Sequence, residues 1–408
     1  MARDPGGHFI FGIIAALLFI AAAILHLSGV SLSPLHNALI FHRQAPPKRV
    51  AAFVAPAHYF WLSRDFSPGD PGLVDVVGAG DVMMGSRDQG LDPDIDAAND
   101  VSELVGEAIP AIFHRADIAF VNLEGPLYDG DDPPAKTCAH CYVFRSPTSY
   151  ARLLAQLGVS AVSLANNHAG DYGDAGRATT IAALQANHIG YFGLDRDDAR
   201  IAEHTLKSGD RAAIVSFAPN TGTLDINDPD AEARLIRDLK ASHRIVVVSF
   251  HGGGEGKDYE HVVAGHVFFD GEDRGDVVTF AHTAIDAGAD IVIGQGPHVP
   301  RALELYRGHL IAYSLGNFWT YGGIDTSAAR GAGPVLEAWL APDGTLAGFA
   351  IHSTEQHEMG VPRPDPEGDA ERRILALTRA DFPETAARLD KAQRGSKRTA
   401  QSRARIRG

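Results

Sequence analysis

From Leu73 onward the chain alternates short apolar runs with amphipathic helical patterns, and no other feature constrains its fold as strongly. Strands that alternate with helices are typical of layered α/β domains. The apolar runs with the length of buried strands are Val74–Val77, Ile118–Val121, Val159–Leu164, Ala212–Phe217, Ile245–Phe250, Ile291–Gly294 and Leu310–Tyr313. The helical patterns cover Ser149–Leu157, Gly176–Ala186, Ala231–Ala241, Asp276–Ala287 and a segment near Ala370–Leu377.

The pattern changes after Gly331. Two apolar segments, Val335–Leu340 and Leu346–His352, flank the turn sequence Pro342-Asp343-Gly344, which predicts a β-hairpin with a tight turn. An antiparallel pair at the end of a strand–helix alternation indicates a mixed sheet or a β-sandwich. We therefore predict one α/β domain over residues 71–360.

The N-terminal segment contains a nearly uninterrupted apolar run from Phe9 to Leu27. Its length is about that of a membrane-spanning helix, roughly 20 residues, and exceeds the apolar region of a typical cleaved signal peptide. We predict a transmembrane anchor over residues 1–30 and a proline-containing linker over 31–70. The charges that flank the run do not decide its orientation: Arg3 precedes it, and Arg43, Lys48 and Arg49 follow it.

The overall charge is strongly acidic, with a formal net charge of −15. This balance argues against nucleic acid as a partner. The exception is the C-terminal segment 361–408, which we predict to contain a helix and then a basic tail without acidic residues after Asp390. A solvated tail is the simplest interpretation of those charges.

The only two cysteines, Cys138 and Cys141, form a C-x-x-C motif between sequences typical of a loop. A structural zinc site normally needs four ligands, and a thioredoxin-like pair normally opens a helix. Outside the cytoplasm the pair can form a local disulfide. We predict such a staple, with two free thiols as the alternative.

Polar residues recur where successive predicted strands end, which is where α/β proteins place their sites. Taken alone, the Asn166–His168 stretch is explained equally well as a turn that caps a helix, and Asp81 is better explained as an N-cap. Asn122 with Glu124 could form a polar turn, His251 could bond a backbone carbonyl, and His298 could lie on the surface. Their shared position favours a joint site, and carboxylate, amide and imidazole groups suit a zinc, manganese or iron ion. The residues are Asp81, Asn122, Glu124, Asn166, Asn167, His168, His251, Glu255, His298, Ser314 and Asn317.

These motifs resemble the bacterial CapA/PgsA family of poly-γ-glutamate capsule biosynthesis proteins, which is related to the calcineurin-like metallophosphoesterases. The similarity covers about residues 73–355 and rests on Gly80-Asp81, Asn122-Leu123-Glu124, Asn166-Asn167-His168 with Asp171 and Gly173, His251 with Glu255, Gly294 to Val299, and Tyr313 to Phe318. It implies a metallophosphoesterase-like two-sheet β-sandwich flanked by helices, held at the membrane by the N-terminal helix. It also implies an extracytoplasmic domain that acts on poly-γ-glutamate beside membrane synthase subunits.

The resemblance also implies roles for individual residues. His168 would protonate the leaving group. The residues expected to bind a divalent metal are Asp81, Glu124, Asn167, His251 and His298. Those expected to bind substrate or shape the site are Asn122, Asn166, Glu255, Ser314 and Asn317.

Two positions depart from the phosphoesterase pattern. Met83 stands where a D-x-H motif needs histidine, and Gly296 stands where an H-x-H motif needs it. Neither thioether nor glycine replaces imidazole on such a metal, so we expect one ion rather than two. Three hypotheses stay open: metal-assisted hydrolysis of a γ-glutamyl amide or a phosphoester, a non-catalytic polymer-binding accessory subunit, and a tethered phosphoesterase that faces the cytoplasm.

Overall fold

The computed structural model describes residues 58–393 except 64, 68, 86–99, 132–134, 137–141, 322–323 and 358–359. The predicted transmembrane anchor, the Cys138/Cys141 pair and the basic tail lie outside these residues. Within the described part, no helix combines the length and the apolar character needed to cross a bilayer.

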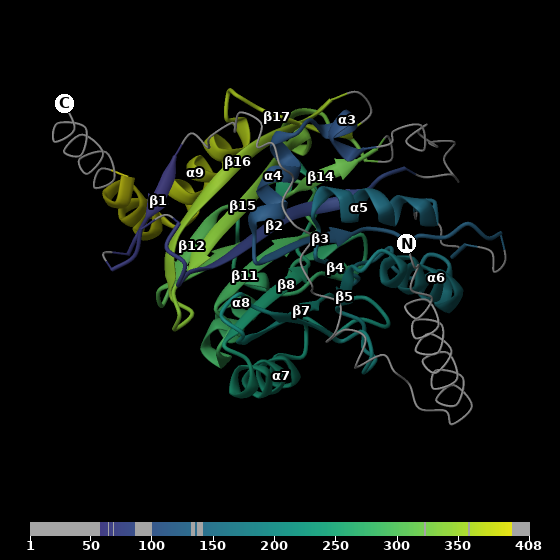
Figure 1. The fold of residues 1–408 in the computed structure, drawn as a ribbon, viewed down its shortest axis with the longest axis horizontal. Helices are drawn as coiled ribbons and strands as arrows, with labels where there is room; N and C mark the ends of the chain where they lie inside the picture. The colour runs from purple at the N-terminus through teal and green to yellow at the C-terminus, as the bar shows by residue number, and fades with distance from the viewer. Residues whose placement is uncertain are drawn as a thin grey trace, which may run out of the picture.

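Two β-sheets lie face to face, and helices cover both outer faces (Figure 1). Side chains of both sheets, such as Phe120 and Ile293, form the buried core between them. Separate apolar clusters join each sheet to its own helices. The mixed α/β architecture predicted from the alternation of strands and helices is therefore confirmed.

The first sheet has nine strands in the order β1-β16-β15-β2-β3-β4-β5, with β14 paired to β2 and β17 paired to β16. β2, β3, β4 and β5 run parallel to one another. The strands are β1 (Tyr59–Trp61), β2 (Val74–Met83), β3 (Ile118–Leu123), β4 (Ala161–Ser163), β5 (Gly190–Phe192), β14 (Asn317–Thr320), β15 (Ala332–Leu340), β16 (Leu346–His357) and β17 (Val361–Pro364).

The second sheet has six strands in the order β12-β13-β11-β8-β7-β6. Its central strands β7, β8, β11 and β13 are parallel. The strands are β6 (Ile201–Thr205), β7 (Arg211–Phe217), β8 (Ile245–His251), β11 (Ile291–Gln295), β12 (Leu303–Tyr306) and β13 (His309–Ala312). A separate short hairpin joins β9 (Phe268–Phe269) to β10 (Glu272–Asp273).

The helices divide between the two sheets. α3 (Val101–Val105), α4 (Ala108–Arg115), α5 (Ala151–Leu157) and α6 (Gly173–Ala186) contribute to the apolar cluster of the first sheet. α7 (Pro229–Ser242) and α8 (Val277–Ala287) cover the second sheet. α9 (Asp369–Asp381) packs against β12, β15 and β16.

Local sequence explains where the helices of the second sheet begin. The Asp228 side chain accepts a hydrogen bond from the backbone of Ala231, and Pro229 occupies the first turn of α7. Asp276 caps α8 in the same way, through the backbone of Thr279. The predicted helices and the β15–β16 hairpin are present within a few residues of their expected bounds.

The predicted end of the first strand at Val77 is wrong, because β2 continues to Met83. The pairing with β3 shifts register between Gly78 and Asp81, so a bulge absorbs the irregular residues without ending the strand. Glycine is required at Gly80, because an added Cβ would lie 1.9 Å from the carbonyl oxygen of Gly316. Asp81 consequently lies inside a strand rather than in a loop after one.

Ordered structure also occurs outside residues 71–360. β1, which falls in the segment predicted as a linker, pairs antiparallel with β16. β17 and α9, which follow the predicted domain, pack on the same sheet. The edge of the first sheet is thus completed by both ends of the described chain.

Candidate metal centre

The two sheets bring the predicted site residues together at the carboxyl ends of parallel strands. Glu124 follows β3, the Asn166–His168 segment follows β4, His251 is the last residue of β8, and His298 follows β11. Asp81 joins them from within β2. Opposing sheets therefore supply one shared site, as the position of a site in an α/β fold leads one to expect.

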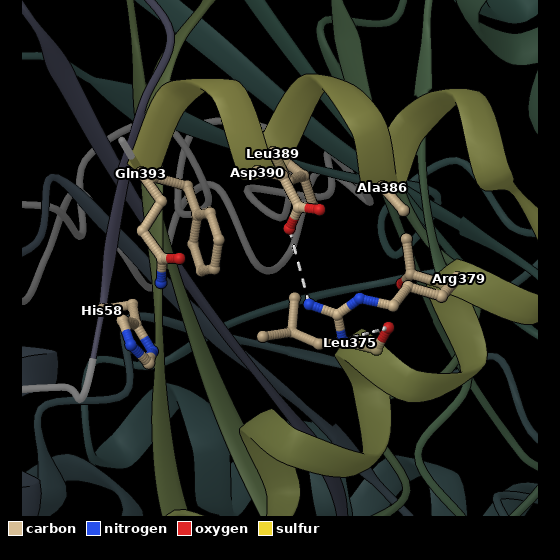
Figure 2. A pocket seen from close by; sticks show the side chains of 9 residues that line it. His58, Leu375, Arg379, Ala386, Leu389, Asp390 and Gln393 are labelled. Carbon is tan, nitrogen blue, oxygen red and sulfur yellow. Dashed lines mark hydrogen bonds and ion pairs between the residues drawn. The ribbon is translucent and has the colours of Figure 1, made fainter. Parts of the chain in front are cut away.

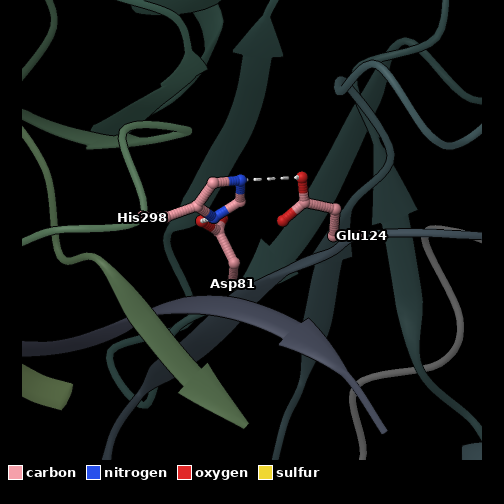
Figure 3. Close-up of side chains that lie close together, drawn as sticks. All are labelled: Asp81, Glu124 and His298. Carbon is pink, nitrogen blue, oxygen red and sulfur yellow. Dashed lines mark ion pairs between the residues drawn. The ribbon is translucent and has the colours of Figure 1, made fainter. Parts of the chain in front are cut away.

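Asp81, Glu124 and His298 form the centre of this site (Figure 3). All three side chains are buried, and one potential ligand atom from each lies within 4.8 Å of the others. His298 Nδ1 is 3.0 Å from Asp81 Oδ2, and its Nε2 is 3.6 Å from Glu124 Oε1. These three residues form what we call the metal cluster.

The position of His298 is maintained against backbone strain. Its φ of +58° lies in the left-handed region, which is unusual for a residue with a side chain. Asn317 Oδ1 lies 3.0 Å from the ring Nδ1 and fixes the ring orientation. Asn317 lies opposite Asp81 in the pairing of β14 with β2. Its contact with His298 therefore links the segment after β11 of the second sheet to β2 of the first sheet.

Asn122 connects the metal cluster to His251. Its Nδ2 donates to Asp81 Oδ1 over 2.8 Å and contacts His251 Nδ1 at 3.2 Å. Because the amide nitrogen is a donor, Nδ1 of His251 accepts, and the neutral ring then carries its proton on Nε2. That nitrogen lies 3.9 Å from Glu124 Oε1. In this arrangement His251 presents an N–H to the site, and acting as a metal ligand through Nε2 would require a different tautomer.

The three side chains of the Asn166–His168 turn make different contacts. Asn166 Oδ1 accepts from the backbone of His168 at 3.0 Å and of Ala169 at 2.8 Å, while its Nδ2 donates to Asn122 Oδ1. Asn166 therefore shapes the turn and holds Asn122. The neighbouring Asn167 Oδ1 is buried and has no hydrogen-bond partner among the described residues.

His168 is held by an aspartate that lies three residues later. Its Nδ1 is 2.9 Å from Asp171 Oδ2, and its ring packs on Phe144 with centroids 4.1 Å apart. Lys136 Nζ lies 2.6 Å from Asp171 Oδ1 and donates to the Asn167 carbonyl. Burial lowers the pKa of His168 despite the opposing effect of Asp171. Lys136 carries no motif that marks it in the sequence.

Glu255 and Ser314 lie at the border of the site. Glu255 forms an ion pair with Arg274 at 2.9 Å, and its second oxygen is 3.9 Å from His298 Nε2. Ser314 instead donates to the Val299 carbonyl and accepts from Gly316, so it shapes a turn. Arg274 was not found from the sequence, because a single arginine after a short hairpin has no local signature.

The backbone conformation and the surroundings of position 296 disfavour a histidine there. Gly296 has a φ of +107°, and an added Cβ would lie 3.1 Å from His251 Nε2. A histidine there would be strained and would crowd the His251 ring. Met83, at the other departing position, is buried with 1% exposure at the end of β2.

The residues fit a divalent cation by an accounting of hydrogen bonds. Both carboxylate oxygens of Glu124 are buried without a hydrogen-bond partner in the described part of the chain, as is Asn167 Oδ1. Buried acceptors are normally paired, and an unpaired carboxylate is costly. Oxygen acceptors that converge on an aspartate and an imidazole form a donor set that a divalent ion satisfies.

The electrostatics agree with a site that needs a cation. Burial raises the pKa of Glu124 well above its usual value, with Asp81 and Glu255 adding to it. Burial lowers the pKa of His298, but Glu124 and Asp81 outweigh it and raise the pKa to about 10. Burial holds the pKa of His251 well below its usual value. Without a metal, the His298 imidazolium supplies the positive charge in the cluster.

A separate small pocket lies between the start of the described chain and its C-terminal helices (Figure 2). It is crossed by the Arg379–Asp390 ion pair at 3.5 Å. None of the predicted site residues lines it. The lining residues are His58, Phe60, Leu375, Thr378, Arg379, Ala386, Leu389, Asp390 and Gln393.

Residues 75–321, more than half of the chain, match the family model described as "Bacterial capsule synthesis protein PGA_cap". The chain belongs to this family. The resemblance inferred from the strand-end motifs is thereby confirmed, and the matched region contains every residue of the metal cluster.

Curated relatives carry related names. The chain is 26% identical over 284 residues to the PGA biosynthesis protein CapA of Bacillus subtilis, covering 65% of this chain and 69% of that protein. It is 25% identical over 256 residues to the capsule biosynthesis protein CapA of Bacillus anthracis, covering 59% and 58%. It is 31% identical over 238 residues to a probable polyglutamine synthesis accessory protein of Mycobacterium tuberculosis, covering 52% and 58%. The chain thus spans less than two thirds of the length of the latter two.

Solved structures with a partial resemblance include a 5'-nucleotidase precursor from Thermus thermophilus, at 12% identity and a TM-score of 0.39 over 76% of this chain and 59% of that one. A purple acid phosphatase from yellow lupin has 15% identity and a TM-score of 0.34 over 76% and 56%. Both TM-scores lie below 0.5, so these resemblances say nothing about activity.

Proposed function

We propose that this protein acts in poly-γ-glutamate capsule synthesis as a metal-dependent hydrolase that cleaves the γ-glutamyl amide of the polymer. Membership of the capsule synthesis family and the names of the relatives support the polymer as substrate. The observation that carries the hydrolase assignment is the buried Glu124 carboxylate, which has no hydrogen-bond partner in the described part of the chain and lies beside Asp81 and His298. Buried carboxylates normally have hydrogen-bond partners, and this one lies within reach of a second carboxylate and an imidazole.

The residues that would hold the ion are Asp81, Glu124, Asn167 and His298, with one ion of zinc, manganese or iron. Such a cation supplies Lewis acidity that polarises the bond to be broken. His251 directs its Nε2–H toward Glu124, where it can donate to an oxygen that gains negative charge during the reaction.

His168 would complete the hydrolysis by proton transfer. Water adds to the amide carbonyl carbon while Nε2 of the imidazole takes one of its protons; the C–N bond then breaks, and the departing nitrogen receives that proton from the imidazole. Asp171 fixes Nδ1 of the ring, and this leaves Nε2 as the nitrogen that exchanges the proton. Lys136 and Phe144 hold Asp171 in turn, so the acid is oriented before substrate arrives.

The proposed cellular setting follows from residues outside the described part of the chain. The apolar run from Phe9 to Leu27 would anchor the protein in the membrane, with the domain on the extracytoplasmic side near synthase subunits. Oxidation of Cys138 with Cys141 in native protein is the result expected from this placement. Fully reduced thiols would favour the cytoplasmic-facing alternative.

A second candidate function is a non-catalytic accessory subunit that binds the polymer. Two observations favour it: a relative is named as an accessory protein, and Met83 and Gly296 replace histidines of the phosphoesterase pattern. The same site on a phosphoester is a third candidate, which requires its own assay.

The test compares the full-length protein with its Glu124→Gln and His168→Gln variants on poly-γ-glutamate and on a generic phosphodiester, before and after chelation. The proposal expects metal-dependent cleavage of the polymer by the wild type and its loss in both variants, with metal retained by His168→Gln. Metal-free protein that is inert on both substrates would refute the hydrolase function. Cleavage of the phosphodiester alone would establish the third candidate.

His251→Ala distinguishes the two possible roles of that residue. If His251 donates a hydrogen bond, the variant keeps its metal and loses turnover. If His251 is a ligand in another tautomer, metal content and turnover fall together.

A further inference from the structure

Arg274 lies under the glycine-rich loop that follows β8. Its backbone carbonyl accepts from Gly253 at 2.8 Å, and its own N–H donates to Val267 at 2.8 Å. The side chain is only 2% exposed, although arginine is rarely buried to this extent. A cation is therefore held by the backbone at a position that Glu255 links to the metal cluster.

The hydrogen bonds of this guanidinium are incomplete. Nη1 is 2.9 Å from Glu255 Oε1 and 3.9 Å from Glu272 Oε2, while the buried Nε and Nη2 have no hydrogen-bond partner among the described residues. Arg301, which is 3% exposed and packs under the same loop, donates through Nε to the Tyr259 carbonyl and through Nη2 to the Gly254 carbonyl. Loop support thus explains Arg301 but leaves two nitrogens of Arg274 unexplained.

Glu255 connects Arg274 to both the metal cluster and the solvent. One of its oxygens is on Arg274 and the other is 3.9 Å from His298 Nε2. Its side chain is 22% exposed, so it is the solvent-facing partner of the pair. A carboxylate arriving from solvent would reach Arg274 by taking the place of Glu255.

We infer that Arg274 recognises a substrate carboxylate and that the Glu255 carboxylate occupies the position of that carboxylate until substrate binds. This inference rests on the proposed function, because poly-γ-glutamate carries one free α-carboxylate beside each amide bond. A guanidinium binds a carboxylate through two parallel N–H groups, and Arg274 has unused donors for that geometry. The ion pair between Arg274 and the substrate carboxylate would therefore align the amide with the metal cluster, and uncharged chains would be rejected.

The test measures binding to the full-length protein by calorimetry, with Zn²⁺ present and absent. The probes are a γ-linked glutamate oligomer, the same oligomer with α-carboxamides, and a phosphodiester of similar size. The wild type is expected to bind the carboxylate oligomer at least about 10-fold more tightly than the carboxamide, as for a hydrogen bond to a charged group. Arg274→Gln is expected to abolish this ratio, and Glu255→Gln to tighten carboxylate binding by removing the competitor.

Arg301→Gln is the matched control, because it loosens the same loop and is expected to leave the ratio unchanged. Arg274→Lys keeps the positive charge but loses the two parallel N–H groups, so we expect a smaller ratio of carboxylate to carboxamide affinity. This variant tests the inference if Arg274→Gln does not fold. An unchanged ratio in the Arg274 variants, or an equal loss in Arg301→Gln, overturns the inference. Weaker carboxylate binding by Glu255→Gln also overturns the inference. The same holds if the wild type binds neither oligomer, or if the Arg274 variants lose binding of the phosphodiester alone.

The two proposals fail separately. A wild type that prefers the carboxylate oligomer through Arg274 but cleaves nothing removes the hydrolase function and keeps this inference. A wild type that cleaves the polymer with an Arg274-independent preference does the reverse.

Discussion

Two glutamates of the first sheet are equally buried, at 1% exposure, and have opposite surroundings. Glu337, in β15, receives hydrogen bonds from Arg115 Nε at 2.6 Å and His352 Nε2 at 2.7 Å. Glu124, after β3, has no hydrogen bond to either oxygen within the described structure. Burial tends to raise both pKa values, but the bonds from His352 and Arg115 lower that of Glu337, whereas that of Glu124 stays raised.

The difference distinguishes a structural ion pair from the metal site that we propose. The Glu337 carboxylate is satisfied by the protein, so it contributes to the fold and has no capacity left for a ligand. The two Glu124 carboxylate oxygens accept no hydrogen bond from the described residues and lie beside Asp81 and a histidine, so a bound cation would account for their burial. A third case, Glu232 in α7, is buried and unpaired but belongs to no such cluster.

The largest expected effect is on stability, from Glu337→Ala. Glu337→Ala removes the buried carboxylate that accepts hydrogen bonds from Arg115 and His352, and breaking a buried pair in this way costs about 3–5 kcal/mol. Denaturant unfolding followed by circular dichroism measures the loss. A loss below about 1 kcal/mol would contradict the structural role of the pair.

The next effect is on metal affinity, from Glu124→Gln. The amide keeps the shape but removes the charge, so we expect Zn²⁺ affinity to fall about 100-fold, or roughly 2.7 kcal/mol, with little loss of stability in the metal-free state. Isothermal titration calorimetry measures the affinity. Glu232→Gln is the matched control, because it changes an equally unpaired buried glutamate outside the cluster and should leave Zn²⁺ binding unchanged.

The smallest effect over any single pH unit is the pH dependence that Glu232 imposes on stability. Burial raises the pKa of Glu232 to about 9, so folded protein keeps the proton that unfolded protein releases above its ordinary pKa. The contribution of Glu232 to stability is therefore complete below about pH 4.5 and is lost as pH rises toward 9, by at most about 1.4 kcal/mol per pH unit. Thermal melts from pH 5 to 9 should show this decline in the wild type and a flatter curve in Glu232→Gln. Identical curves would contradict the assignment.

Much of the fold was predictable because it depends on local pattern. Apolar runs of strand length, the caps of α7 and α8, and the turn before β16 all have sequence signals. The continuation of β2 through Gly80 has no such signal, because Gly-x-Gly predicts a turn. Only the structure shows that Gly80 packs against the backbone of Gly316. The pairing of β14 with β2 likewise depends on tertiary structure: the sequence predicts Asn317 at the site, but it does not show that Asn317 lies in a strand opposite Asp81.

The site shows the same division. Residues at strand ends were found because parallel strands share an edge, and the structure places Asp81, Glu124 and His298 together. Arg274 and Lys136 were missed because their importance depends on which groups they touch rather than on their neighbours in sequence. The tautomer of His251 depends on an amide from another strand, Asn122, and no spacing rule gives it.

The most direct test of the central claim is Zn²⁺ titration of the full-length, metal-stripped protein, with thermal melting and calorimetry read together. Binding of one ion per chain to the wild type and to Glu232→Gln, with a rise in melting temperature, and its loss in Glu124→Gln is the predicted result. Absence of binding to the wild type, or equal binding by Glu124→Gln, would contradict the claim that the unpaired carboxylate marks a metal centre.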